Sequence, residues 1–124
     1  MSEQQKVKVL LDTDIGTDID DAVCLAYLLQ QPKCNLLGIT TVTGQAMERA
    51  KLASAICRWA GRDVPICPGA DDPILVAQRQ TIAQQAECLP RWDHQERFPR
   101  GEAVEFLRAR FKEYDGKYLL SSGV

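Results

Sequence analysis

Apolar segments with two different periods alternate along this chain, and this alternation limits the possible folds more than any other feature. Short runs rich in β-branched residues and leucine, typical of buried strands, occur at residues 7–11, 35–42, 64–67 and 117–120. Segments with apolar residues three and four apart, the spacing of one helix face, occur at residues 21–29, 46–60 and 101–114. The pattern predicts an α/β fold: an open, mainly parallel, Rossmann-like sheet with flanking helices.

The connections between these segments are mostly short. Pro32 and Gly61 follow the first two helical segments and are typical helix stops. Residues 70–100 differ, because they are polar, contain prolines and show no clear period. A connection of this length inside a compact domain is usually functional or mobile.

Composition excludes several classes of protein. The chain has 124 residues and a formal net charge of −2, which argues against a general nucleic-acid binder. No apolar run approaches the roughly 20 residues of a membrane span, and the polar first residues lack the apolar core of a secretory signal. The five cysteines form no CxxC pair, which is typical of reduced thiols. We therefore expect a cytoplasmic protein with no membrane and no nucleic-acid partner.

An acidic loop follows the first predicted strand. Five aspartates fall within ten residues, before or at the start of the first predicted helix: Asp12, Asp14, Asp18, Asp20 and Asp21. Ligands of open parallel sheets bind beyond the carboxyl ends of the strands, which is where this loop lies. Because like charges this close repel one another, a hard cation such as Ca²⁺ or Mg²⁺ would stabilise the cluster. Helix capping and solvation are the alternative explanation.

Three known site types are compared with this loop. An EF-hand starting at Asp12 fails, because its sixth and twelfth positions hold Thr17 and Val23 rather than glycine and glutamate. A phosphate-binding P-loop fails for lack of its glycines and its Lys-Ser/Thr pair. The order Asp12-Thr13-Asp14 also occurs in haloacid dehalogenase-like phosphatases, although Gly16 stands where they usually have threonine or valine.

A better match is to one enzyme family. The run Leu11-Asp12-Thr13-Asp14-Ile15-Gly16-Thr17-Asp18-Ile19-Asp20-Asp21-Ala22 resembles the N-terminal signature Asp-x-Asp-x-Gly-x-Asp-Asp-Ala of the inosine/uridine-preferring nucleoside hydrolases, with two extra residues before the Asp-Asp pair. The resemblance continues through Ile39-Thr40-Thr41-Val42-Thr43-Gly44, Arg49-Ala50 and Val64-Pro65-Ile66-Cys67-Pro68-Gly69-Ala70. It covers most of residues 7–120.

The resemblance implies a chemistry and a set of residue roles. Enzymes of this family use Ca²⁺ to hydrolyse the N-glycosidic bond of ribonucleosides, giving ribose and a free base. Asp14 resembles the general base and Asp21 the bidentate calcium ligand, while Asp12 resembles the aspartate that helps to hold the ion. Asp20 resembles the aspartate that binds a ribose hydroxyl. Gln45 stands where many members have an asparagine that contacts the ribose.

Family members are more than twice as long as this chain. We therefore expect residues 1–124 to form the N-terminal portion of a nucleoside hydrolase-like domain, apparently truncated, and to show little or no hydrolysis alone. A non-catalytic remnant that binds metal, or that associates through its last strand, is the alternative. A homo-oligomer is predicted for the same reason, since that strand is followed by no helix. The Asp-x-Asp phosphatase is a weaker alternative.

Overall fold

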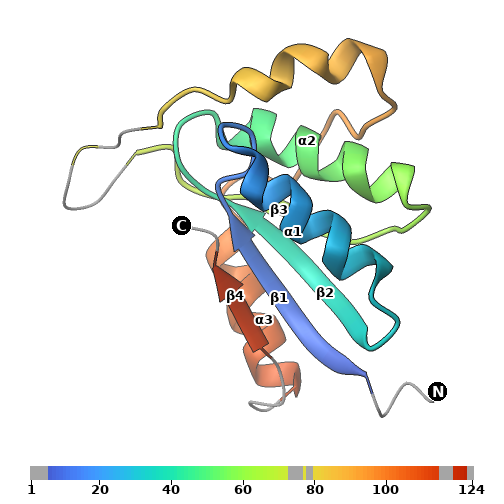
Figure 1. Cartoon of the computed structure of the whole chain (residues 1–124). Coiled ribbons are helices and arrows are strands. Elements are labelled where there is room, and N and C mark those ends of the chain that lie inside the picture. The colour runs from blue at the N-terminus through green and yellow to red at the C-terminus, as the bar shows by residue number, and fades with distance from the viewer. Residues whose placement is uncertain (1–5, 73–76, 78–79, 115–118, 123–124) are drawn as a thin grey trace.

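A computed structural model of the chain describes residues 6–72, 77, 80–114 and 119–122. Four strands form one sheet in the order β3-β2-β1-β4, and every neighbouring pair is parallel (Figure 1). The elements in chain order are β1 (Val7–Thr13), α1 (Ile19–Gln30), β2 (Cys34–Thr41), α2 (Ala46–Trp59), β3 (Ile66–Pro68), the 3-10 helix η2 (Gln84–Arg91), α3 (Ala103–Tyr114) and β4 (Leu119–Ser122). The predicted α/β fold with a parallel sheet and flanking helices is confirmed.

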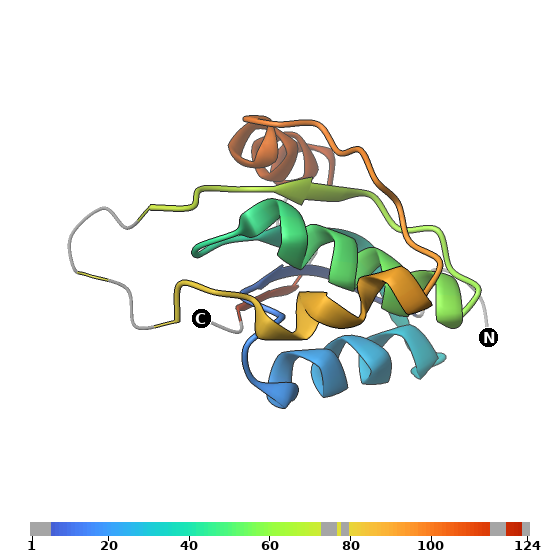
Figure 2. The same ribbon diagram turned by 90° about the horizontal axis from the view of Figure 1, so that it is seen from above.

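The helices cover both faces of the sheet. Figure 2 shows α3 on one face and α1 with α2 on the other. Val9 and Leu11 of β1 point toward α1 and α2 and share a core cluster with Leu25 of α1 and with Ala50 and Ala53 of α2. Small alanines on α2 let that helix approach the strands closely, as expected for an interior packed to high density.

A β-bulge in β2 decides which side chains face each other across the sheet. Val9 pairs with Leu36 but Leu10 pairs with Gly38, so Leu37 is the extra residue. Since successive side chains of a strand alternate between faces, a shift of one residue exchanges the two faces. The bulge therefore places Leu36 and Ile39 in the same core cluster and aligns Thr40 with Asp12.

The predicted segment boundaries need several corrections. The first helix begins at Ile19 rather than at residue 21, and the third begins at Ala103 rather than at residue 101. The third strand is Ile66–Pro68 rather than residues 64–67. The last strand is Leu119–Ser122, two residues later than predicted, and residues 117 and 118 lie outside the described part of the chain. Strand ends depend on which backbone groups find a neighbouring strand, and periodicity does not report this.

The expectation that residues 70–100 are wholly irregular is wrong. Residues 84–91 form η2, which packs on α2 through Leu52, Ala83 and Leu89. Ala83, Ala86 and Leu89 recur every three residues, which is the repeat of a 3-10 helix. The period was therefore visible, but it matches neither an α-helix nor a strand.

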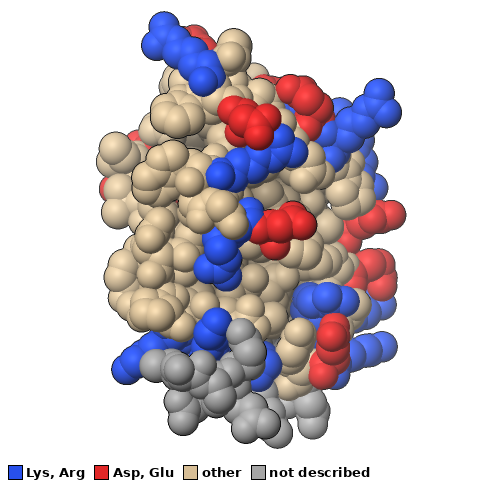
Figure 3. Space-filling model, turned by 90° about the vertical axis from the view of Figure 1, so that its right-hand side faces the viewer, with Lys and Arg blue, Asp and Glu red and all other residues tan. Residues whose placement is uncertain are grey.

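An apolar groove of about 400 Å³ lies between α1, α2 and η2. Its lining includes Ile19, Trp59 and Trp92, whose side chains are more than half exposed. Figure 3 shows one face of the molecule, where described acidic and basic side chains are intermixed beside a broad uncharged area. Exposed apolar side chains such as those that line this groove are typical of interfaces. The homo-oligomer stays a prediction.

No helix within the described residues is long and apolar enough to cross a membrane.

Candidate functional site

The acidic loop lies at the carboxyl ends of β1 and β2. Asp12 belongs to β1, Asp14 follows the strand directly, and Asp20 and Asp21 lie in the first turn of α1. Negative charge there is stabilised by the positive end of the helix dipole. The β2–α2 loop lies beside it and contains Thr43 and Gln45 at φ of 77° and 63°, a left-handed conformation that is costly for residues other than glycine. Backbone strain of this kind is concentrated at functional sites.

Asp14 and Asp21 are neighbouring acidic side chains in the loop. The buried Thr13 hydroxyl donates a 2.8 Å hydrogen bond to Asp21 Oδ2 and accepts one of 3.1 Å from the Ile15 amide, so it orients the Asp21 carboxylate. Burial, and then the neighbouring Asp21, raise the pKa of Asp14 from 3.8 to about 6. Two carboxylates held this close favour either a shared proton or a bound cation.

Asp12 takes a separate position. Thr40 donates a 2.8 Å hydrogen bond to Asp12 Oδ1 across the sheet, as the bulge in β2 allows. Burial raises the pKa of Asp12, and this hydrogen bond partly offsets the shift. Among the described residues, no three His, Cys, Asp or Glu side chains lie close enough together to hold a metal ion. The structure therefore brings two of the three predicted metal ligands together, Asp14 and Asp21. The third, Asp12, is instead hydrogen-bonded to Thr40.

The predicted substrate-binding residues lie at the rim of the loop. Asp20 is exposed on the first turn of α1. Gln45 accepts a 2.8 Å hydrogen bond at its side-chain Oε1 from the Ala83 amide. The side chain of Gln45 therefore holds the segment before η2 against the β2–α2 loop. The sequence did not predict this contact.

Arg49 is a residue of the site that the sequence pattern did not single out beyond its place in the family motif. Its side chain is fully buried, and its guanidinium binds the loop after β1, the loop after β2 and Gln80. Burial lowers the pKa of Arg49, while Asp14, Asp21 and Asp71 raise it. One signal was available: Arg49 lies beside Ala46, Ala50 and Ala53 on the apolar face of α2, where a charged residue is unexpected.

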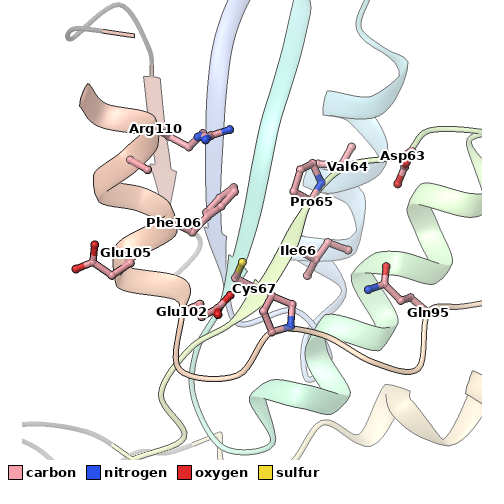
Figure 4. A pocket seen from close by; sticks show the side chains of 12 residues that line it. Asp63, Val64, Pro65, Ile66, Cys67, Gln95, Glu102, Glu105, Phe106 and Arg110 are labelled. Atoms are coloured by element: carbon pink, nitrogen blue, oxygen red, sulfur yellow. The ribbon is translucent and has the colours of Figure 1, made fainter. Parts of the chain in front are cut away.

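A second cavity lies away from this loop. It has a volume of about 730 Å³ and is formed between β3 and α3 (Figure 4). Its walls combine apolar side chains such as Ile66 and Phe106 with Glu102, Glu105 and Arg110. None of the predicted site residues lines this cavity, so the acidic pair and the cavity are separate features.

A pH-dependent stability follows from the acidic pair. The pKa of Asp14 is higher in the folded chain than the ordinary 3.8, so the folded state binds this proton more tightly than the unfolded state does. In cation-free buffer, the stability that this bound proton contributes is therefore lost as the pH rises from about 4 to about 6. We expect Asp14→Asn to raise the free energy of unfolding at pH 7 by about 1 kcal/mol, a value reduced for partial exposure, and to change it little at pH 4.

The measurement is thermal unfolding of both proteins from pH 4 to pH 7 with a chelator present. Asp63→Asn is the matched control, because it removes an exposed carboxylate outside the loop. A wild-type chain that gains stability relative to Asp14→Asn as the pH rises would contradict the repulsion between Asp14 and Asp21.

Comparison with known proteins assigns the family. The model of the inosine-uridine preferring nucleoside hydrolase family matches residues 9–121. The chain belongs to this family. The match includes most of β1, the acidic loop, β2 and α2, the parts of the chain that contain Asp14, Asp21 and Arg49.

Individual nucleoside hydrolases are similar to the chain over part of their length. It is 29% identical over 122 residues to uridine nucleosidase 1 of Arabidopsis thaliana, which covers 89% of this chain and 34% of the relative. It is 30% identical over 84 residues to the non-specific ribonucleoside hydrolase RihC of Escherichia coli, covering 66% of this chain and 27% of the relative. It thus spans about a third or less of these relatives.

A solved structure supports the fold. The chain superposes on the plant nucleoside hydrolase PpNRh1 with a TM-score of 0.76 and 22% sequence identity. The superposition covers 94% of this chain and 39% of that enzyme. At this identity the likeness establishes the shared arrangement of strands and helices.

Proposed function

We propose that the acidic loop is the cation-binding and catalytic part of a ribonucleoside hydrolase, which cleaves the N-glycosidic bond of its substrate to ribose and a free base. The observation that carries this proposal is the pairing of Asp14 with Asp21 at the carboxyl end of β1, with Thr13 orienting Asp21. Family membership supports the hydrolase class. The names of the relatives, a uridine nucleosidase and a non-specific ribonucleoside hydrolase, support ribonucleosides as substrates.

We propose Ca²⁺ as the cation. The donor set fits in part, because Asp14 and Asp21 offer hard carboxylate oxygens that repel each other in the absence of a positive ion. The chemistry that Ca²⁺ would supply is compensation of this charge and polarisation of the attacking water. Asp21, fixed by Thr13, is the proposed bidentate ligand, and Asp12 is proposed to support the site from β1 through its contact with Thr40.

The remaining roles follow from the chemistry of the reaction. Asp14 is proposed to accept a proton from the attacking water, because its carboxylate lies at the site where the cation would bind that water. Departure of the base leaves positive charge on the sugar, which nearby carboxylates stabilise. Asp20 is proposed to accept a hydrogen bond from a ribose hydroxyl, and Gln45 to contact the ribose from the β2–α2 loop.

Isothermal titration of Ca²⁺ into the 124-residue chain tests the cation site. Two carboxylates fill only part of the coordination shell of Ca²⁺, so we expect weak binding, roughly 10⁻⁴ to 10⁻³ M. Asp14→Asn/Asp21→Asn is expected to weaken it at least about tenfold, whereas the control Asp63→Asn leaves it unchanged. A folded chain that binds no Ca²⁺, or a double variant that binds as well as the wild type, would refute the site.

Release of free base from inosine and from uridine tests the activity. We propose little or no turnover by this chain alone, because the described residues gather only two ligands for the cation. The non-catalytic alternative also predicts calcium binding without turnover. Only measurable hydrolysis therefore separates the hydrolase from a non-catalytic metal-binding remnant. Hydrolysis by the wild type that is lost in Asp14→Asn would show that turnover requires Asp14, and would overturn the proposed inactivity. The phosphatase alternative is tested with a phosphate ester and Mg²⁺, and the family match gives it no support.

A further inference from the structure

Arg49 is the most connected side chain at the candidate site. It projects from α2, and none of its surface is exposed to solvent. Nε donates a 2.7 Å hydrogen bond to the carbonyl of Gly44, Nη1 donates one of 2.7 Å to the carbonyl of Asp14, and Nη2 donates one of 2.9 Å to the carbonyl of Gln80. One guanidinium thus joins three segments that are far apart in the sequence.

Thr17 extends this contact. Nη1 of Arg49 also donates a 3.0 Å hydrogen bond to Thr17 Oγ1, and the same hydroxyl donates a 2.9 Å hydrogen bond to the carbonyl of Ile82. The Gln85 amide donates to the carbonyl of Gly16 at 2.9 Å. The segment from Gln80 to Gln85, which we call the strap, is therefore tied to the acidic loop along its length.

The geometry of these contacts requires arginine. A guanidinium has donors fixed in one plane and pointing in several directions, so it can bind three separate carbonyls at once. A lysine ammonium is a single point with three donors on a flexible stem, so it cannot reach all three. Burial makes the requirement stricter, because each carbonyl that loses its donor away from water becomes costly.

We propose that Arg49 is a positioning residue for the acidic pair, which it couples to the strap by holding the main chain of Asp14. Arg49 binds the main-chain carbonyl of Asp14, the residue whose side chain carries the proposed base. The guanidinium therefore determines where that carboxylate lies relative to Asp21. The strap and the acidic loop are then ordered together. This inference rests on the proposed function for its consequence, but the anchoring itself is independent of it.

The test compares Arg49→Lys with Arg62→Lys. Arg62 is a suitable control because its Nη1 also binds a main-chain carbonyl, that of Leu29, at 3.0 Å and outside the acidic loop. For Arg49→Lys we expect Ca²⁺ affinity to fall at least about tenfold and the amides of Ala83 and Gln85 to exchange hydrogen at least about tenfold faster. Arg62→Lys is expected to change neither.

Thr17→Val is the second variant, and it is needed if lysine at position 49 prevents folding. It removes the hydroxyl that joins Arg49 to Ile82 and leaves the guanidinium in place, so smaller changes in the same direction are expected. Unchanged Ca²⁺ affinity in the folded variants overturns the proposal. The amide of Arg62, which donates to the carbonyl of Cys57, lies outside the strap and the acidic loop. If its hydrogen exchange rises as much as that of Ala83 and Gln85, the whole fold has loosened, and this result also overturns the proposal. A wild type that binds no Ca²⁺ refutes the proposed function, and exchange at Ala83 and Gln85 then decides the anchoring alone.

Discussion

Alanine at position 44 is expected to lower the free energy of unfolding by about 3 kcal/mol and the melting temperature by roughly 10 °C. A Cβ on Gly44 would collide with the carbonyl group of Thr81, which belongs to the main chain and cannot rotate away. The strap must then move off the β2–α2 loop. This breaks the hydrogen bonds that Arg49 and Gln45 make to Gln80 and Ala83.

Thermal unfolding of Gly44→Ala beside Gly61→Ala measures this effect. Gly61 has φ of 69°, and a Cβ added there would meet no atom within 4 Å, so alanine carries backbone strain alone, about 1 kcal/mol. Gly44→Ala should also weaken Ca²⁺ binding, since the acidic loop and the strap share Arg49. If alanine costs no more at position 44 than at position 61, the close approach of Thr81 is wrong.

Alanine at position 38 is expected to lower the free energy of unfolding by about 2 kcal/mol. Gly38 follows the bulge of β2, and the ring of Phe106 from α3 packs directly on it, where a Cβ would overlap the ring. The ring must turn away, and the cavity between β3 and α3 that Phe106 lines offers room for part of this movement. This is why the expected loss is smaller than at Gly44, where main chain is the obstacle.

A double-mutant cycle with Phe106→Leu checks the contact. Phe106→Leu alone is expected to destabilise by about 1 kcal/mol, and the double variant to be more stable than the sum of the two losses predicts by about 1 kcal/mol. The readout is urea unfolding monitored by circular dichroism. Strictly additive losses would show that the Phe106 ring does not rest on Gly38.

The location of the candidate site could be predicted from local sequence, but its internal contacts could not. Five aspartates after a buried strand placed an acidic loop at the carboxyl end of the sheet, and the structure has it there. Which aspartates meet depends on the hydroxyls of Thr13 and Thr40, which bind Asp21 and Asp12 respectively. Thr40 is 28 residues from Asp12, and only the bulge in β2 aligns the two.

The alternation of strands and helices is a local property, so the sequence alone determined the α/β class and the parallel sheet. Each segment carries its own period because a strand or helix must bury one face, whatever its neighbours are. The tertiary structure alone decided the burial of Arg49, the anchoring of the strap and the pairing of Asp14 with Asp21. These contacts join residues far apart in the chain, and their geometry depends on strand register and side-chain packing, which no local period encodes.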